Sequence, residues 1–435
     1  MSALPTHRAA MAAVVLAVVS AVLPGGWAAS ALGAVVLVAA LGVELVLAVP
    51  PRRLQFKRRL PPSLALGQVG ELGWEVHNPT NRSVRVALAD EVPPSWRLAD
   101  RRAVLRVPPR SSVTRRRPIR PARRGRFAVA EIVLRTYGPL GLAARQQAFE
   151  VPSQLRVTPA FPSRAATELL LDQRRALGSG VRTTRIRGAG TEFDHLREYQ
   201  IDDDYRRLDW AATARRGHPV VRTYRAERNQ QVAVLLDSGR LMAATVAGAT
   251  RLEHALDAAL ALALAAGRLG DRLSFEAHDH RPRVSLPALE RADRAPMLID
   301  ALIDLEPRLV ETDYRVAARH LSDRARRRCL AVVLTDLAEA VTVEAMLPAL
   351  EVLARRHLVM VATVADPELL AWADGPAEGV SAAYRKAAAA RTLEQRRAMA
   401  ATLARRGMIV LDETPQRLPL ALVESYLAIK AEQRL

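Results

Sequence analysis

The chain has 435 residues, half of them hydrophobic, and carries a net charge of +19. This length gives room for two or three domains with sizeable cores, and the single cysteine, Cys329, excludes an intramolecular disulfide. The positive charge comes almost entirely from arginine, which GC-rich coding alone could produce, so it does not by itself indicate nucleic-acid binding.

Two apolar segments open the chain, at residues 9–23 and 27–43, and a Pro-Gly-Gly turn separates them. A signal peptide is the competing interpretation of the first segment. The second segment follows without a charged gap, which favours a two-helix transmembrane hairpin over residues 1–50, with Glu44 close to the membrane interface. Arg8 precedes the hairpin and five basic residues follow it, so both ends are expected in the cytoplasm: Arg52, Arg53, Lys57, Arg58 and Arg59.

Residues 51–165 carry short alternating apolar runs separated by Asn, Pro, Gly or Ser, which predicts a small all-β sandwich. The expected strands are 72–77, 84–88, 104–107, 127–134 and 155–158. Eleven arginines lie between Arg101 and Arg126 without an acidic residue. Such a run is most often a solvated face, and the functional alternative is contact with anionic lipid. We assign no chemistry to the turn at 136–142.

Residues 166–229 contain a densely charged stretch in which carboxylates, arginines and aromatic residues alternate. A disordered linker would not hold so many aromatic residues. The conspicuous positions are Gly188, Gly190, Glu192, Phe193, Leu196, Arg197, Tyr199, Asp203, Asp204, Arg206, Asp209, Trp210, Ala214 and Arg215.

This stretch resembles the signature of the DUF58 family of bacterial proteins, G-x-G-x-E-F-x-x-L-R-x-Y followed by D-D-x-R-x-x-D-W. The resemblance implies that an arginine-rich strand leads next into a von Willebrand A-like domain. It also implies a bacterial, multi-pass membrane protein whose partner is a MoxR-type AAA+ ATPase.

From residue 230 to 435 the pattern changes to buried strands alternating with amphipathic helices, which independently predicts a doubly wound α/β domain with a parallel sheet. The expected strands are 232–236, 272–277, 284–286, 330–334, 358–364 and 408–411. The expected helices are 251–269, 296–305, 314–326, 343–355, 381–405 and 418–431.

A von Willebrand A domain binds a divalent ion through D-x-S-x-S after its first strand, a later Thr and a later Asp. Here the first motif is Asp237-Ser238-Gly239-Arg240-Leu241, so both ligating serine positions have lost their hydroxyls. Thr312 and Asp336 occupy the other positions, and these oxygens could still hold Mg²⁺ with several waters. Otherwise no cofactor is expected. The alternative is that Asp237 caps its loop or pairs with Arg240, and that Asp336 caps a helix start.

We find no enzyme signature. The carboxylates at 202–204 and 209 alternate with arginines, which favours a structural ion-pair network over a catalytic set. Gly188 and Gly190 lack the spacing of a phosphate-binding loop. Cys329 opens an apolar strand and is expected to be a buried filler, and His278 and His280 are expected in a surface turn.

The sequence therefore predicts a membrane-anchored protein-interaction module, an adaptor or chaperone-like partner of the ATPase. Its expected contact surface is Asp237, Ser238, Thr312, Asp336, Glu192, Arg197, Asp203, Asp204, Arg206, Asp209 and Trp210. The alternative is a metal-dependent hydrolase at the cytoplasmic membrane face, with Asp237 and Asp336 as ligands and a carboxylate of the 202–209 cluster as base. Specific nucleic-acid binding is not expected, because the arginine run lacks interleaved aromatic residues.

Overall fold

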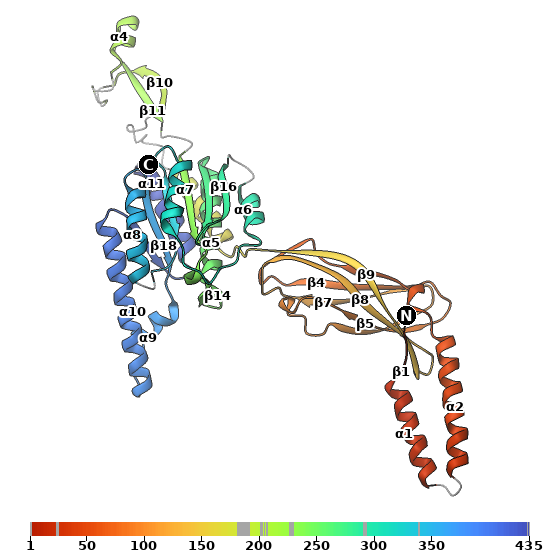
Figure 1. Cartoon of the computed structure of the whole chain (residues 1–435). Helices are drawn as coiled ribbons and strands as arrows, with labels where there is room; N and C mark the ends of the chain where they lie inside the picture. The colour runs from red at the N-terminus through yellow and green to blue at the C-terminus, as the bar shows by residue number, and fades with distance from the viewer. Residues whose placement is uncertain are drawn as a thin grey trace. The chain divides into compact units, whose positions relative to one another are not determined.

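The computed structural model describes residues 2–22, 26–180, 192–200, 203, 205, 208–225, 230–289, 294–337, 340–432 and 434. It divides into two compact units, Met1–Thr158 and Pro159–Leu435 (Figure 1).

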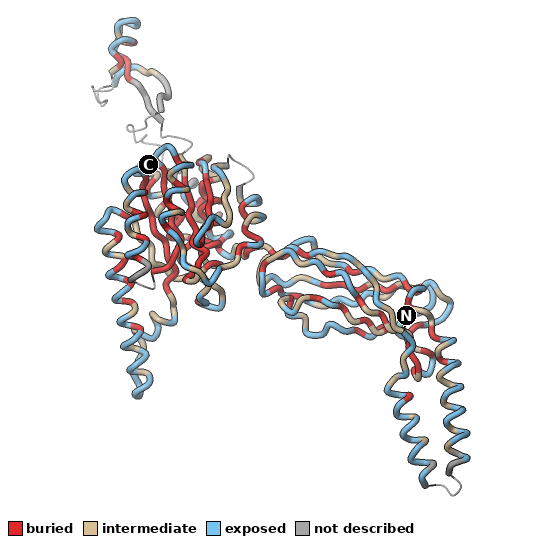
Figure 2. The backbone as a smooth tube through the Cα atoms, viewed as in Figure 1, coloured by how far each residue is buried: buried red, intermediate tan, exposed pale blue. Residues whose placement is uncertain are grey.

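The first unit begins with two apolar helices, α1 (His7–Val22) and α2 (Gly26–Leu47), which lie side by side (Figure 1). Both helices are largely exposed along their length (Figure 2). The segment Ser30–Arg53, built mainly on α2, is long and apolar enough to cross a membrane, with a hydropathy of 2.6, whereas α1 contributes a shorter apolar stretch. The chain thus has an N-terminal helix suited to membrane association.

The rest of the first unit is a sandwich of two sheets, as expected. One sheet has the order β1-β9-β8-β5-β6 with β3 beside β9, and the other has the order β2-β4-β7. Leu72 and Trp74 of one sheet and Leu88 and Leu134 of the other share one core. The strands are β1 (Ser2–Pro5), β2 (Gln55–Arg59), β3 (Ser63–Ala65), β4 (Gly70–Asn78), β5 (Val84–Asp90), β6 (Arg102–Val107), β7 (Ser111–Ile119), β8 (Gly125–Tyr137) and β9 (Ala143–Thr158).

One basic residue counted toward the membrane orientation is buried in this sandwich. Arg58 donates to Asp90 at 2.7 and 3.0 Å, and both side chains are fully buried. Trp74 Nε1 donates to the same carboxylate at 2.7 Å. Arg58 is therefore an internal ion-pair partner, and Arg52, Arg53 and Lys57 remain as the exposed, unpaired flanking charges within the described residues.

The turn at 136–142, to which we assigned no chemistry, joins the helices to the sandwich. Glu44 of α2 is buried, and its carboxylate accepts hydrogen bonds from the backbone N–H groups of Leu140 (2.6 Å), Gly141 (3.0 Å) and Leu142 (3.0 Å). A Cβ atom at Gly138 would lie 2.3 Å from Glu44 Oε2, which explains glycine there. The strand before α1 is held at the same turn, because Thr6 Oγ1 donates to Gly141 O at 2.6 Å.

The second unit is built on a six-stranded sheet of order β16-β15-β12-β17-β18-β19, parallel except for the edge strand β16. This confirms the multidomain α/β prediction. The strands are β12 (Gln231–Asp237), β15 (Arg272–His278), β16 (Pro282–Leu289), β17 (Leu330–Leu334), β18 (Leu358–Val364) and β19 (Ile409–Glu413), and a small ribbon is formed by β13 (Thr245–Val246) and β14 (Ala249–Thr250).

Helices cover both faces of this sheet, whose strands are the buried layer in Figure 2. One face packs against α3 (Arg164–Gly180), α5 (Arg251–Leu269), α6 (Arg294–Leu302) and α11 (Leu418–Ala431). The other packs against α7 (Tyr314–Arg324), α8 (Ala340–Ala354) and α10 (Val380–Arg405). Helices α3 and α9 (Pro367–Asp374) were not predicted.

The charged stretch forms a small antiparallel hairpin rather than a linker. Strand β10 (Glu192–Glu198) pairs with β11 (Val220–Arg225), and the short helix α4 (Trp210–Arg216) lies between them in sequence. We call these three elements the signature hairpin.

Candidate functional site

The predicted site lies where the parallel strands end. Strand β12 pairs with both β15 and β17, so its last residue, Asp237, is in register with His278, the last residue of β15. Asp336 follows the end of β17 by two residues, and Thr312 lies in the loop before α7. The topology therefore brings the predicted residues to one edge of the sheet, as expected for parallel strands.

The carboxylate of Asp237 is buried and saturated with hydrogen bonds. Oδ1 accepts from the N–H of Gly239 at 2.7 Å and from the hydroxyl of Thr312, and Oδ2 accepts from Tyr314 and Thr335, each at 2.8 Å. Asp237 thus caps its own loop, and Thr312 is its direct partner. Arg240, which we considered as a partner, pairs instead with Glu311.

Tyr314 is a neutral donor to this carboxylate. Burial raises the pKa of its phenol well above the ordinary value, and the nearby charge of Asp237 raises it further. The hydroxyl therefore keeps its proton at neutral pH and can donate it to Asp237, and it also contacts Thr335 Oγ1 at 2.8 Å.

Asp336 is fully buried, and residues 338 and 339, at the helix start that it was expected to cap, lie outside the described residues. Its Oδ1 accepts from Arg396 Nη1 at 2.8 Å and from Thr363 Oγ1 at 3.0 Å, while Arg251 forms an ion pair with Oδ2 at 2.9 Å. Arg396 also binds Asp412 at 2.7 Å. Burial would lower the pKa of Arg396, but these two carboxylates outweigh burial and raise it.

These residues do not fit Mg²⁺. Two guanidinium groups already neutralise Asp336, and all four lone-pair directions of Asp237 are used. A Cβ atom at Gly239 would lie 2.3 Å from Thr312 Oγ1, so the lost serine position also lacks room for a ligand. The hydroxyl of Thr312 occupies the place that the motif gives to a serine.

The side chains of Asp237, Ser238 and Asp336 are therefore buried within their own unit, with exposed fractions of 3%, 0% and 0%. We expected their side chains on an open contact surface, and that expectation is wrong for these positions. Their backbone still shapes the edge, because Ser238 N donates to His278 O at 2.7 Å and Ser238 O accepts from Arg308 N at 2.8 Å.

The exposed groups at this edge come from the loop between α6 and α7. Arg240 N donates to Val310 O at 2.9 Å, which fixes this loop to the end of β12. The loop presents Leu309, whose side chain is 83% exposed, beside the surface pair of Arg240 and Glu311. We call Leu309, Arg240 and Glu311 the rim.

In the signature hairpin, the charged residues mainly hold the local structure. Arg197 forms an ion pair with Asp203, which agrees with a structural network. Asp209 caps α4, accepting from Ala212 N at 2.9 Å. The next residue, Trp210, is 70% exposed. Asp204, Arg206 and the side chain of Glu192 lie outside the described residues.

One cluster of metal-ligating side chains was not predicted from the sequence. Glu276 and His278 lie on β15 and are buried, and His320 of α7 faces them; their ligand atoms lie within 4.8 Å of one another. We expected His278 in a surface turn, which is wrong, because it ends a buried strand. Burial would raise the pKa of the Glu276 carboxyl, but hydrogen bonds and charge from the two histidines hold it below its ordinary value. The spacing Glu276-x-His278 on one strand face was the available signal.

The chain is an α/β protein with an N-terminal apolar helix, and residues 195–405 match a family model described as "Protein of unknown function DUF58". Uncharacterized proteins of Mycobacterium tuberculosis and Mycobacterium bovis are 29% identical over 184 residues, which is 42% of this chain. The matched region spans 57% of the length of those relatives. Among solved structures, the conserved hypothetical protein BatB from Bacteroides thetaiotaomicron is 18% identical, with a TM-score of 0.33 over 47% of this chain and 100% of that one.

Proposed function

We propose that this protein is a membrane-anchored interaction module that binds a MoxR-type AAA+ ATPase through exposed side chains of its second unit. The observation that carries the proposal is the exposure of large aromatic residues on the signature hairpin. Trp210, the first residue of α4, is 70% exposed although the preceding Asp209 caps this helix, and Tyr205, which lies between β10 and α4 in sequence, is 67% exposed. Exposed Trp and Tyr on a locally ordered element are typical of binding hot spots.

The membrane anchor is a hairpin of both apolar helices. At about 1.5 Å per residue, the 22 residues of α2 span roughly 33 Å, enough for a hydrocarbon core of about 30 Å, whereas α1 is shorter and reaches most of the way. Large apolar side chains point outward from both helices, which in water would be an aggregation hazard and in lipid is the expected state. They include Met11, Val14, Val15, Val18, Leu32, Val35, Val38 and Val46.

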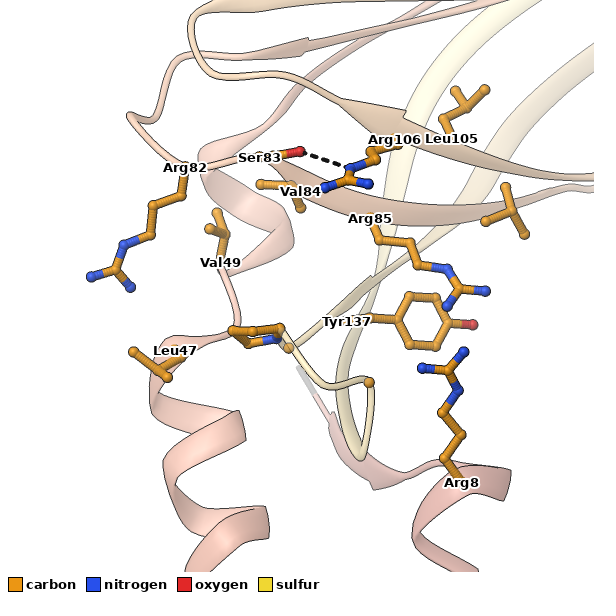
Figure 3. Close-up of a pocket in the computed structure, with 14 residues that line it drawn as sticks. Arg8, Leu47, Val49, Arg82, Ser83, Val84, Arg85, Leu105, Arg106 and Tyr137 are labelled. Carbon is orange, nitrogen blue, oxygen red and sulfur yellow. Dashed lines mark hydrogen bonds between the residues drawn. The ribbon is translucent and has the colours of Figure 1, made fainter. Parts of the chain in front are cut away.

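A basic groove at the base of this hairpin supports a cytoplasmic orientation and contact with anionic lipid (Figure 3). The groove has a volume of about 640 Å³ and is lined by Arg8, Arg82, Arg85 and Arg106, with the Arg85 guanidinium 5.1 Å from the centre of the Tyr137 ring. No carboxylate in the described part of the chain pairs with these four arginines. Each contributes on the order of 1 kcal/mol near an anionic leaflet.

In this proposal the α/β unit is a von Willebrand A-like domain in which internal ion pairs take the place of the metal site. A partner then has no metal to bind, and contacts the rim instead. Leu309 supplies an apolar anchor, and the pair of Arg240 and Glu311 supplies polar contacts around it. In this proposal Asp237, Thr312 and Asp336 position the loops that form the rim, and the ATPase supplies the nucleotide chemistry.

Co-purification from detergent-solubilised membranes tests this proposal. We expect Trp210→Ala and Leu309→Ala each to reduce recovery of the ATPase, identified by its Walker motifs, by at least about tenfold, because hot-spot truncation costs about 2 kcal/mol or more. Tyr384→Ala is the matched control, because Tyr384 is an aromatic residue of α10 that is 76% exposed. Equal recovery with all three variants would contradict the proposal.

A further inference from the structure

One buried face of the parallel sheet carries polar side chains where apolar ones are the rule. Along β15, Ser274, Glu276 and His278 alternate with Leu273, Phe275 and Ala277, which belong to the core on the α5 side. The three polar residues therefore face the α7 side, and all are buried. Burying a carboxylate and an imidazole costs several kcal/mol unless both are compensated, so this row requires a physical reason.

The geometry shows what compensates them. Glu276 Oε2 lies 3.1 Å from His278 Nε2, and Glu276 Oε1 lies 3.4 Å from His320 Nδ1. The two imidazole rings are 5.8 Å apart between centres and inclined at 73°. Each nitrogen carries either a lone pair or a proton, and a lone pair facing a carboxylate oxygen is repulsive. The cluster therefore needs two protons, one for each contact, or a single cation between the three groups.

We infer that Glu276, His278 and His320 bind one divalent transition-metal ion of the Zn²⁺ class. Ligand atoms about 2.0–2.1 Å from a tetrahedral Zn²⁺ are about 3.4 Å from each other. One ligand atom from each of the three residues lies within 4.8 Å of the other two, so small side-chain rotations bring all three to one ion. Two imidazoles and one carboxylate favour Zn²⁺ or Co²⁺ over the hard cations Mg²⁺ and Ca²⁺, which prefer oxygen ligands. The His320 side chain is 39% exposed, so the ion has a path from solvent and a fourth position for water.

Two further side chains contact the Glu276 carboxylate: Arg324, which competes with an ion for it, and Ser285, which is neutral. Arg324 Nε lies 3.5 Å from Glu276 Oε1, and Arg324 is 44% exposed, so it can swing into solvent when an ion binds. Ser285 Oγ of the neighbouring strand lies 3.4 Å from the same oxygen. Because Arg324 and the ion compete for one carboxylate, removal of this arginine strengthens metal binding.

This inference is independent of the proposed ATPase contact, since none of the three ligands belongs to the rim or to the signature hairpin. His278 does connect to the sheet edge, because its carbonyl accepts from Ser238 N at 2.7 Å. A bound ion would therefore hold the end of β15 beside β12 and stiffen that edge.

The test is a titration of the full chain in detergent, without a polyhistidine tag and after treatment with chelator, using Zn²⁺ by calorimetry and Co²⁺ by visible absorption. We expect one ion per chain, and a loss of affinity of at least about tenfold in His320→Ala, which removes a half-exposed ligand without opening the core. Arg324→Gln should bind more tightly, because it removes the guanidinium that competes with the ion for Glu276.

His280→Ala is the matched control, because His280 lies two residues from His278 but is exposed and outside the cluster. It should bind Zn²⁺ as the unaltered chain does. His278→Gln, checked by circular dichroism for retained fold, should lose binding as His320→Ala does. The inference is overturned if the unaltered chain shows no saturable binding, or if His320→Ala binds as tightly as His280→Ala.

Discussion

Arg396 is the residue on which the sheet edge most depends. It is 3% exposed and links Asp336 to Asp412, so its removal leaves Asp412 without this buried ion pair and Asp336 with Arg251 alone. We expect Arg396→Met to lower the free energy of unfolding by about 3–5 kcal/mol, the usual result of breaking a buried ion pair from one side. Urea unfolding of the full chain measures this. The neighbouring exposed Arg397→Met should change stability by less than about 0.5 kcal/mol, and equal effects would contradict the assignment.

Cys329 offers a second test at the same scale. It is completely buried, as the sequence predicted, and burial raises the pKa of its thiol to about 12. Only the thiolate reacts with disulfide reagents, so the native chain should resist modification at about pH 8 and react fully once unfolded. A thiol titration with and without denaturant decides the matter. Stoichiometric reaction of the native chain would show that the strand opens readily.

The sequence predicted which residues lie at this edge of the sheet, but not the hydrogen bonds and ion pairs that they form there. Asp237 and Asp336 could be placed at one edge because parallel strands deliver their last residues there, whereas Thr312 was placed by the resemblance to a von Willebrand A domain. The ion-pair partners of Asp336 could not be predicted, since Arg251 and Arg396 come from helices far away in the sequence. Only the packing of helices on both faces of the sheet brings the two arginines to one carboxylate. His278 was misplaced because a polar Asp-His pair beside it suggested a turn, although the strand continues through His278.

At the scale of elements, the junction between α2 and the turn after β8 can be tested with two glycines. Gly138→Ala would bring a Cβ atom within 2.3 Å of the Glu44 carboxylate and displace it from its backbone donors. We expect a loss of about 1–3 kcal/mol of stability in the first unit. Gly42 lies on α2, as Glu44 does, and has open space around it. Gly42→Ala should therefore leave stability unchanged or raise it slightly. Thermal unfolding in detergent compares the two variants. Equal losses of stability would contradict the proposed role of the hydrogen bonds between Glu44 and the turn after β8.

The elements found from sequence were those with the strongest periodicity. The buried strands and amphipathic helices of the α/β unit lie close to where they were expected, because continuous β-branched runs are typical of parallel sheets. Only the last quarter of β9 was predicted, since its middle has no fully buried residue and alternates exposed residues such as Glu150 and Gln154 with half-buried ones. Helix α3 was missed although it is amphipathic, and its partner α5 lies about 90 residues away.

At the scale of the whole molecule, the proposed orientation can be measured with introduced cysteines, because the native Cys329 is buried. We expect Gly25→Cys, in the connection between the two helices, to react with an impermeant maleimide in intact cells. Ser83→Cys, beside the basic groove, should react only after the membrane is permeabilised. The reverse pattern would place the soluble units outside the cytoplasm.

The central proposal is that the signature hairpin binds an AAA+ ATPase while the N-terminal helices anchor the chain in the membrane. Photo-cross-linking in living cells tests it directly, with a photoreactive phenylalanine analogue at position 210 and, as control, at the equally exposed position 384. We predict that position 210 forms a covalent adduct with a protein carrying Walker motifs and that position 384 does not. Adducts at 210 that contain only this chain, or the same ATPase adduct from both positions, would contradict the claim.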